Sequence, residues 1–169
     1  MHSRQIVAVE IVGIIVSVQV DHSPGQQIEV GGDHRQKKKI GDHPCQPLTG
    51  EPALVGELGA DGLHLDSKAL AACSERPLPD YYLVAVSAHS LEALQQGEAM
   101  GASFGVLSPI NYTSAHPDIE PIGWEGMRAA VEQLKIPLYA LGGVTADDQA
   151  AAVAAGGLGI AGNKGLWQL

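Results

Sequence analysis

The sequence is short of positive charge and of long apolar runs. Its 169 residues include 10 lysines and arginines against 19 aspartates and glutamates, which gives a net charge of −9 at pH 7. Nucleic acids and anionic membranes carry charge of the same sign, so we expect neither as a partner. The basic run at residues 35–39 is short, and we interpret it as a solvated loop.

Cysteine is equally scarce. Cys45 and Cys73 are far apart and form no CxxC spacing, which favours reduced thiols in a cytoplasmic protein over a disulfide scaffold. The apolar stretch at residues 6–20 is interrupted by polar residues and glycine, and no small-residue cleavage site follows it. We therefore expect a soluble protein without a transmembrane segment or a signal peptide. Neither GxGxxG nor GxxxxGK[ST] occurs, which argues against dinucleotide and P-loop sites.

Leucine is absent before Pro47, and Ala8 is the single alanine there. The β-branched content predicts strands at 6–12 and 14–20, with a third at 26–30. Glycine, proline and polar residues make 31–47 a loop or linker. We expect a β-rich segment over residues 1–47 and a separate domain over residues 48–169.

Strands and helices alternate from residue 48 onward. The expected helices are 52–58, 67–74, 90–100, 124–134 and 146–155, and the expected strands are 62–65, 83–86, 104–107, 136–141 and 159–161. This alternation predicts about five parallel βα units in an α/β fold. Short strands and tight turns favour a (β/α) barrel over a doubly wound sheet.

Two of the predicted strands end in glycines. One runs into Gly142 and Gly143, with Thr145 as the expected N-cap of the next helix, and the other runs into Gly162. Bare backbone N–H groups near helix starts suit a phosphate. The alternative is that these glycines only make tight βα turns.

The other predicted strand ends carry hydroxyls and histidines, with few carboxylates, and this set suits phosphate or diphosphate better than glycoside hydrolysis. Ser87 and His89 also allow a nucleophile–base interpretation, but no third group of a triad is identifiable. We expect His64 to be a barrel-interior side chain satisfied locally. For His116, in a loop beside a proline, we expect solvent exposure.

Taken together, these stretches resemble thiamine phosphate synthase and its relative TenI, a family of (β/α)8 barrels. The matching pieces are residues 59–65, 86–92, 108–110 with Thr113, 137–145 and 159–167. The amino-acid sequences of residues 113–117 and 162–167 are similar to those of the TenI-type domain that is often fused C-terminal to a Nudix hydrolase. The resemblance covers about residues 49–169.

The resemblance implies a ligand class and two activities. The synthase joins an aminopyrimidine diphosphate to a thiazole phosphate, and TenI moves a proton on the thiazole phosphate. By this likeness Ser87 would contact the diphosphate, Thr113 would help hold phosphate, and the turns with Gly142, Gly143, Gly162 and Asn163 would bind the thiazole phosphate. His89 and His116 are the candidate bases for the tautomerase. A homo-oligomer is compatible with the sequence.

The resemblance also implies Mg²⁺, but Gly50 and Ala69 stand where the family has its metal-binding aspartates, so we expect no metal ligands here. A complete barrel needs at least ~200 residues, so we expect an incomplete TIM-type barrel. Either the N-terminal β segment covers the edge opened beside the fourth strand, or the chain is a truncated product. A non-catalytic domain that binds phosphorylated ligands, and a phosphate-binding enzyme with another substrate, are the alternatives to a synthase or tautomerase.

Overall fold

The computed structural model describes residues 4–11, 14–21, 47–49, 52, 55, 60–114 and 117–162, the first three of these ranges by their backbone. Its strands are β1 (Arg4–Ile11), β2 (Ile14–Asp21), β3 (Pro47–Thr49), β4 (Gly62–Leu65), β5 (Leu83–Ala88), β6 (Phe104–Leu107), β7 (Leu138–Ala140) and β8 (Gly159–Gly162). Its helices are α2 (Ser67–Ala72), α3 (Leu91–Ala99), α4 (Gly123–Gln133), the 3₁₀ turn η1 (Ala146–Asp148) and α5 (Gln149–Ala154). No helix in these ranges is both long and apolar enough to cross a bilayer.

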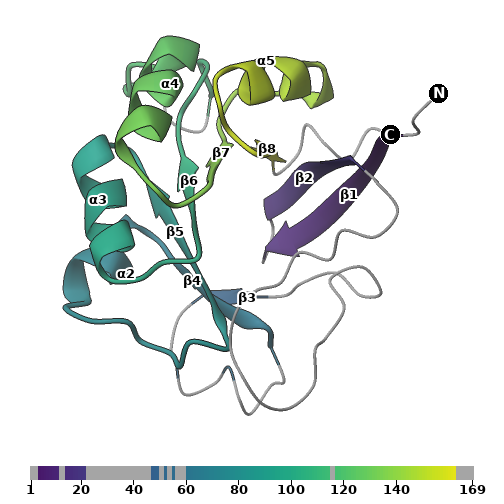
Figure 1. Ribbon diagram of the computed structural model, residues 1–169. Helices are drawn as coiled ribbons and strands as arrows, with labels where there is room; N and C mark the ends of the chain where they lie inside the picture. The colour runs from purple at the N-terminus through teal and green to yellow at the C-terminus, as the bar shows by residue number, and fades with distance from the viewer. Residues whose placement is uncertain are drawn as a thin grey trace.

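All eight strands form one sheet, in the order β1-β2-β8-β7-β6-β5-β4-β3. Strands β3 to β8 run parallel, and helices connect most of them, so the predicted α/β fold with five parallel βα units is confirmed. The structure adds β3 as a sixth, three-residue parallel strand. The helices lie along one side of the parallel strands (Figure 1).

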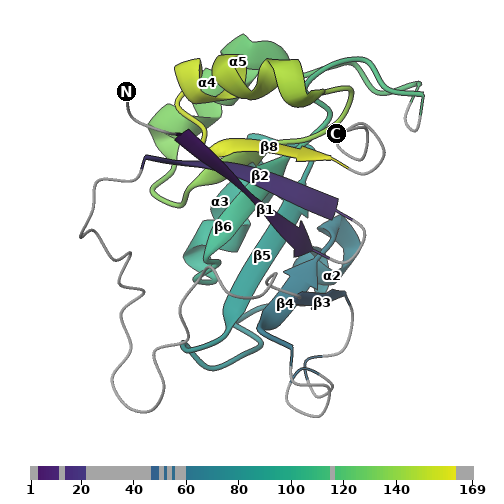
Figure 2. The same ribbon diagram turned by 90° about the vertical axis from the view of Figure 1, so that its right-hand side faces the viewer.

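The N-terminal strands form an antiparallel pair, and β2 continues the sheet antiparallel to β8. They therefore extend the β8 edge, and the edge on the other side of the sheet is β3. One interpretation of the sequence placed the N-terminal β segment over the edge beside β4. The hairpin of β1 and β2 lies at the opposite edge instead. In Figure 2 this pair faces the viewer, with the parallel strands behind it. The strand expected at 26–30 and most of the helix expected at 52–58 lie outside the described residues.

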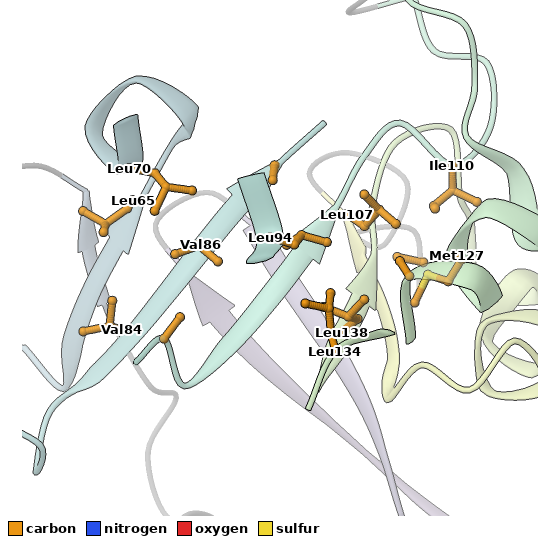
Figure 3. Packing of buried hydrophobic residues seen from close by; sticks show 14 of the residues in the cluster. Leu65, Leu70, Val84, Val86, Leu94, Leu107, Ile110, Met127, Leu134 and Leu138 are labelled. Atoms are coloured by element: carbon orange, nitrogen blue, oxygen red, sulfur yellow. The ribbon is translucent and has the colours of Figure 1, made fainter. Parts of the chain in front are cut away.

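The main hydrophobic core lies between the parallel strands and the helices. Alternate strand residues such as Val86, Leu107 and Leu138 point to this side and pack with Leu94 of α3 and Met127 of α4. Figure 3 shows these side chains meeting between the two layers. Strand residues of opposite parity therefore face the other side of the sheet, which is the interior side of a barrel.

A smaller cluster occupies that interior side. It comprises Val106, Tyr139 and Ala161, with Phe104 and Leu141 packed against it. His64 is buried as well, with 6% of its surface exposed. Side chains alternate along each strand, and His64 faces the same side of the sheet as this cluster. The interior side thus carries a buried polar side chain, His64, beside an apolar cluster.

Candidate phosphate-binding site

The carboxyl ends of β4 to β8 meet at one edge of the sheet, because neighbouring parallel strands point the same way. Ser87 lies near the end of β5, Ser108 follows β6, Gly142 follows β7 by two residues, and Gly162 ends β8. The topology therefore brings together four of the strand ends that the sequence singled out.

The turn after β7 is built on two glycines. Gly142 and Gly143 adopt positive φ angles of 89° and 65°, a conformation that glycine reaches without strain. A Cβ on Gly143 would lie 2.3 Å from the carbonyl oxygen of Tyr112, and one on Gly142 would lie 2.8 Å from Cα of Pro109. This turn thus requires glycine for its backbone angles and for its close approach to the loop after β6.

The hydrogen bonds of this turn use its carbonyl groups. The N–H of Asn111 donates to the carbonyl of Gly142 at 2.9 Å, and the Asn111 side-chain amide donates to the carbonyl of Gly143 at 3.3 Å. In the part of the chain that the structure describes, the N–H groups of Gly142, Gly143 and Val144 donate to no partner. Consecutive unpaired N–H groups are what an anion-binding turn offers.

Thr145 begins the segment that follows. The Asp148 carboxylate accepts hydrogen bonds from the Thr145 N–H at 2.8 Å and from the Thr145 hydroxyl at 3.2 Å. The expected helix forms, with its first turn as η1 and the rest as α5. Because Asp148 already occupies the Thr145 N–H, the donors left for an anion are those of the preceding turn.

Ser87 is paired across the interior side with His64. Nε2 of His64 lies 2.7 Å from Oγ of Ser87. Burial lowers the pKa of His64, and the nearby Asp66 carboxylate opposes this effect in part. The neutral form of His64 is therefore favoured, and its local partner is the Ser87 hydroxyl.

His89 has a different partner from Ser87. Its Nδ1 lies 2.8 Å from the carbonyl oxygen of Ser108 and 3.3 Å from the Ser108 hydroxyl. Because a carbonyl only accepts, Nδ1 carries a proton in this arrangement. The ring is exposed at the carboxyl ends of β5 and β6. Ser87 thus bonds to His64 and His89 bonds to Ser108, which is not the nucleophile–base pairing considered from the sequence.

The remaining predicted residues divide into two groups. Thr113 is half-buried in the loop after β6 and Gly162 is buried at the end of β8. His116 and Asn163 lie outside the described residues. Asn111 was not singled out from the sequence, because nothing short of the fold shows that the loop after β6 contacts the turn after β7.

The end of β4 does not suit a magnesium ion. The Asp66 carboxylate accepts a hydrogen bond from the Ala69 N–H at 2.8 Å and so caps α2. The side chain of Ala69 has no atom that can bind a metal, and Gly50 lies outside the described residues. Among those residues no group of three acidic, histidine or cysteine side chains lies close enough to hold a metal. Hard cations need several oxygen ligands, which this donor set does not supply.

A cavity of about 230 Å³ lies on the helix side, next to α3 and α4. Leu91, Leu107 and Ile122 line it, with His89 and Ser90 beside them. Its lining is mostly apolar, and the unpaired N–H groups of the turn after β7 are not part of it. The cavity is therefore distinct from the candidate phosphate site.

Comparison with known proteins agrees with this architecture. Residues 48–166 match the family model described as thiamine monophosphate synthase (TMP-TENI). The chain belongs to the thiamine monophosphate synthase family. A putative thiamine-phosphate synthase 2 of Aquifex aeolicus is 40% identical over 103 residues, covering 61% of this chain and 55% of that protein. The thiamine-phosphate synthase of Chloroflexus aurantiacus is 36% identical over 120 residues, covering 66% of this chain and 56% of that protein.

Solved structures show the same relationship. The thiamine phosphate pyrophosphorylase of Pyrococcus furiosus superposes with a TM-score of 0.54 and 25% identity, over 69% of this chain and 56% of that one. A structure described as native KDPGal shares the fold, with a TM-score of 0.51 and 20% identity, over 72% of this chain and 57% of that one. The family match is thus confirmed, and the chain spans about half the length of the curated relatives it matches.

Proposed function

We propose that this chain is a cytoplasmic protein that binds phosphorylated intermediates of thiamine biosynthesis, with thiazole phosphate held at the turn after β7 and at the end of β8. The observation that carries this proposal is that the N–H groups of Gly142, Gly143 and Val144 have no partner among the described residues. Phosphate oxygens accept hydrogen bonds, so three adjacent donors at a parallel-strand end match that ligand. Gly162 and Asn163 complete the phosphate site in the proposal, and Thr113 helps to hold phosphate.

The proposal places an aminopyrimidine diphosphate, or its diphosphate group, beside Ser87. Ser87 on β5 is separated from the turn after β7 by two strand spacings, about 10 Å in a parallel sheet. That separation is too large for one phosphate group, so the two positions form two anion subsites. A two-part ligand set of this kind is what the family's joining reaction requires.

The chemistry that follows depends on the end of β4. Synthesis expels diphosphate from the pyrimidine, and a magnesium ion stabilises that leaving group by several kcal/mol in metal-assisted reactions of this type. Asp66 is engaged as a helix cap and Ala69 offers no ligand. We therefore propose binding, rather than magnesium-dependent synthesis, as the primary property of this chain.

A second candidate function is tautomerisation of thiazole phosphate. The observation that favours it is His89, whose Nδ1–H is fixed by the Ser108 carbonyl while the ring lies exposed at the strand ends. Histidine is the side chain most often used as a general acid or base near neutral pH. His116 is the alternative base.

Thermal unfolding with added ligands tests the primary proposal. A ligand that binds only the folded chain raises its stability by about 2.7 kcal/mol at one hundred times its dissociation constant. We expect thiazole phosphate to raise the melting temperature and ribose 5-phosphate, an unrelated phosphate ester, to raise it much less. An equal effect of both would indicate a generic phosphate site, and no effect of either would refute the proposal.

The His89→Asn variant tests the tautomerase candidate. Asparagine keeps a side-chain N–H near the position of Nδ1, so the contact with the Ser108 carbonyl is retained while the basic nitrogen is removed. Loss of tautomerisation with unchanged thiazole phosphate binding would support His89 as the base. Unchanged turnover would exclude it.

A further inference from the structure

The hydrogen bond between His64 and Ser87 joins two neighbouring strands on the interior side of the sheet. His64 has 6% of its surface exposed, and Ser87 is half-buried at the end of β5. The Ser67 hydroxyl, at the start of α2, also donates to the backbone carbonyl of Ser87 at 3.3 Å. The position of Ser87 is therefore held through both its side chain and its backbone.

The direction of the His64–Ser87 bond decides what Ser87 can bind. A serine hydroxyl has one proton and two acceptor lone pairs, and a neutral imidazole nitrogen either donates or accepts. If Ser87 donates to His64, only lone pairs remain for a ligand, and these repel an oxyanion. If Nε2–H of His64 donates to Ser87, the hydroxyl proton is free for a ligand oxygen.

Resting on the proposed function, we propose that His64 is a positioning residue for the diphosphate subsite: its Nε2–H donates to Oγ of Ser87, and the Ser87 hydroxyl proton is thereby directed to a ligand oxyanion. His64 itself is buried beneath Ser87 and acts through it. The histidine that looks like a locally satisfied interior residue thus determines whether the serine above it is a donor or an acceptor.

The burial of His64 favours the neutral form of its ring. Desolvation disfavours the imidazolium form, and the Asp66 carboxylate counters it only in part. The neutral ring carries one proton on one of two nitrogens, so the tautomer is a defined structural property. The tautomer with the proton on Nε2 is the one that makes Ser87 a donor.

Nitrogen-15 NMR of the unliganded wild-type chain measures this tautomer directly. Long-range couplings from the ring protons of His64 distinguish a protonated Nε2 from an unprotonated one, and the His64→Gln spectrum assigns the signals. We expect a protonated Nε2. An unprotonated Nε2 in the free chain would overturn the proposal, and this measurement needs no ligand, so it stands apart from the proposed function.

Calorimetric titration with inorganic diphosphate tests the consequence for binding. We expect His64→Leu and Ser87→Ala each to weaken diphosphate binding by about tenfold, the size of one hydrogen bond to an anion. In the double variant the loss should not exceed that of Ser87→Ala alone, because His64 acts only through Ser87. The His64→Gln variant should recover much of the affinity, since its amide N–H can replace Nε2–H.

Ser103→Ala is the matched control. The Ser103 hydroxyl accepts a hydrogen bond from the Val84 N–H at 3.1 Å, at the amino end of β5 and away from Ser87. We expect this variant to leave diphosphate affinity unchanged. Additive losses in the double variant, or full affinity in folded His64→Leu, would contradict the positioning role. If the wild-type chain binds thiazole phosphate but does not bind diphosphate, the Ser87 subsite alone is refuted. If it binds neither ligand, the proposed function is refuted as well.

Discussion

The ring of Phe104 meets the ring of Tyr139 edge-on, with the ring centroids 5.5 Å apart and the ring planes at 78°. The pair bridges β6 and β7 on the side of the sheet that the helices do not cover. Edge-to-face pairs of this kind stabilise a core beyond the area they bury. Tyr139 is 7% exposed, and burial raises its pKa to about 12.

This burial predicts a loss of stability at high pH. In the unfolded chain Tyr139 ionises near its ordinary pKa of 10.0, whereas in the folded chain it stays neutral until the pH approaches about 12. The folded state is therefore favoured below pH 10, and this advantage is lost progressively as the pH rises from 10 to 12. The limiting loss is about 2–3 kcal/mol for a shift of this size. Urea unfolding measured at pH 9 and at pH 11.5 tests it.

The Tyr139→Phe variant is the control, because it keeps the ring against Phe104 and removes the ionisable hydroxyl. Its stability should fall less between the two pH values than that of the wild type. An identical fall in both proteins would show that Tyr139 is not the group responsible.

Gly142 and Gly101 form a matched pair for testing the turn after β7. Both have φ of 89°, but a Cβ on Gly142 would lie 2.8 Å from Cα of Pro109, whereas one on Gly101 would approach nothing closer than 3.7 Å. Alanine at either position adds backbone strain of about 1–2 kcal/mol. We expect only Gly142→Ala to weaken thiazole phosphate binding as well, by displacing the turn. Equal affinity of the two variants would indicate that the ligand binds elsewhere.

Replacement of Leu94 tests how much the contact between α3 and the sheet contributes to stability. Its side chain is fully buried, and its Cδ2 lies 2.7 Å from the position that a Cβ on Gly105 would occupy. Replacing Leu94 by alanine leaves a cavity between α3 and β6, so the free energy of unfolding should fall by about 3 kcal/mol or more. Leu158→Ala, at a leucine that is 45% exposed, should change it by less than about 0.5 kcal/mol. Chemical denaturation of both variants tests the difference.

Because the side chains at the end of β4 offer no magnesium site, we expect magnesium to leave the thermal stability of the chain unchanged. Asp66 caps α2 through the Ala69 N–H, so its carboxylate is already engaged. We expect the same melting temperature in magnesium chloride and in EDTA when no ligand is present. A clear rise with magnesium alone would reveal a cation site and would restore synthase chemistry as the leading function.

Local patterns were sufficient to predict the parallel strands. The expected bounds 62–65 and 104–107 match β4 and β6, because each is a short apolar run bounded by turn residues. The position of the hairpin could not be predicted, since pairing β2 with β8 joins residues more than one hundred positions apart. The same holds for the site. Glycine turns are visible in the sequence, but the contact of Asn111 with Gly143 and of His64 with Ser87 requires the sheet order.

The antiparallel pairing of β2 with β8 has a consequence for reconstitution. In a closed parallel barrel the eighth strand hydrogen-bonds to the first, through the backbone groups that β8 here shares with Ser17 and its neighbours in β2. A separately supplied polypeptide carrying the opening strands of a related barrel would have to displace the hairpin before it could dock on β8. Complementation by such a fragment would therefore compete with this chain's own N-terminus.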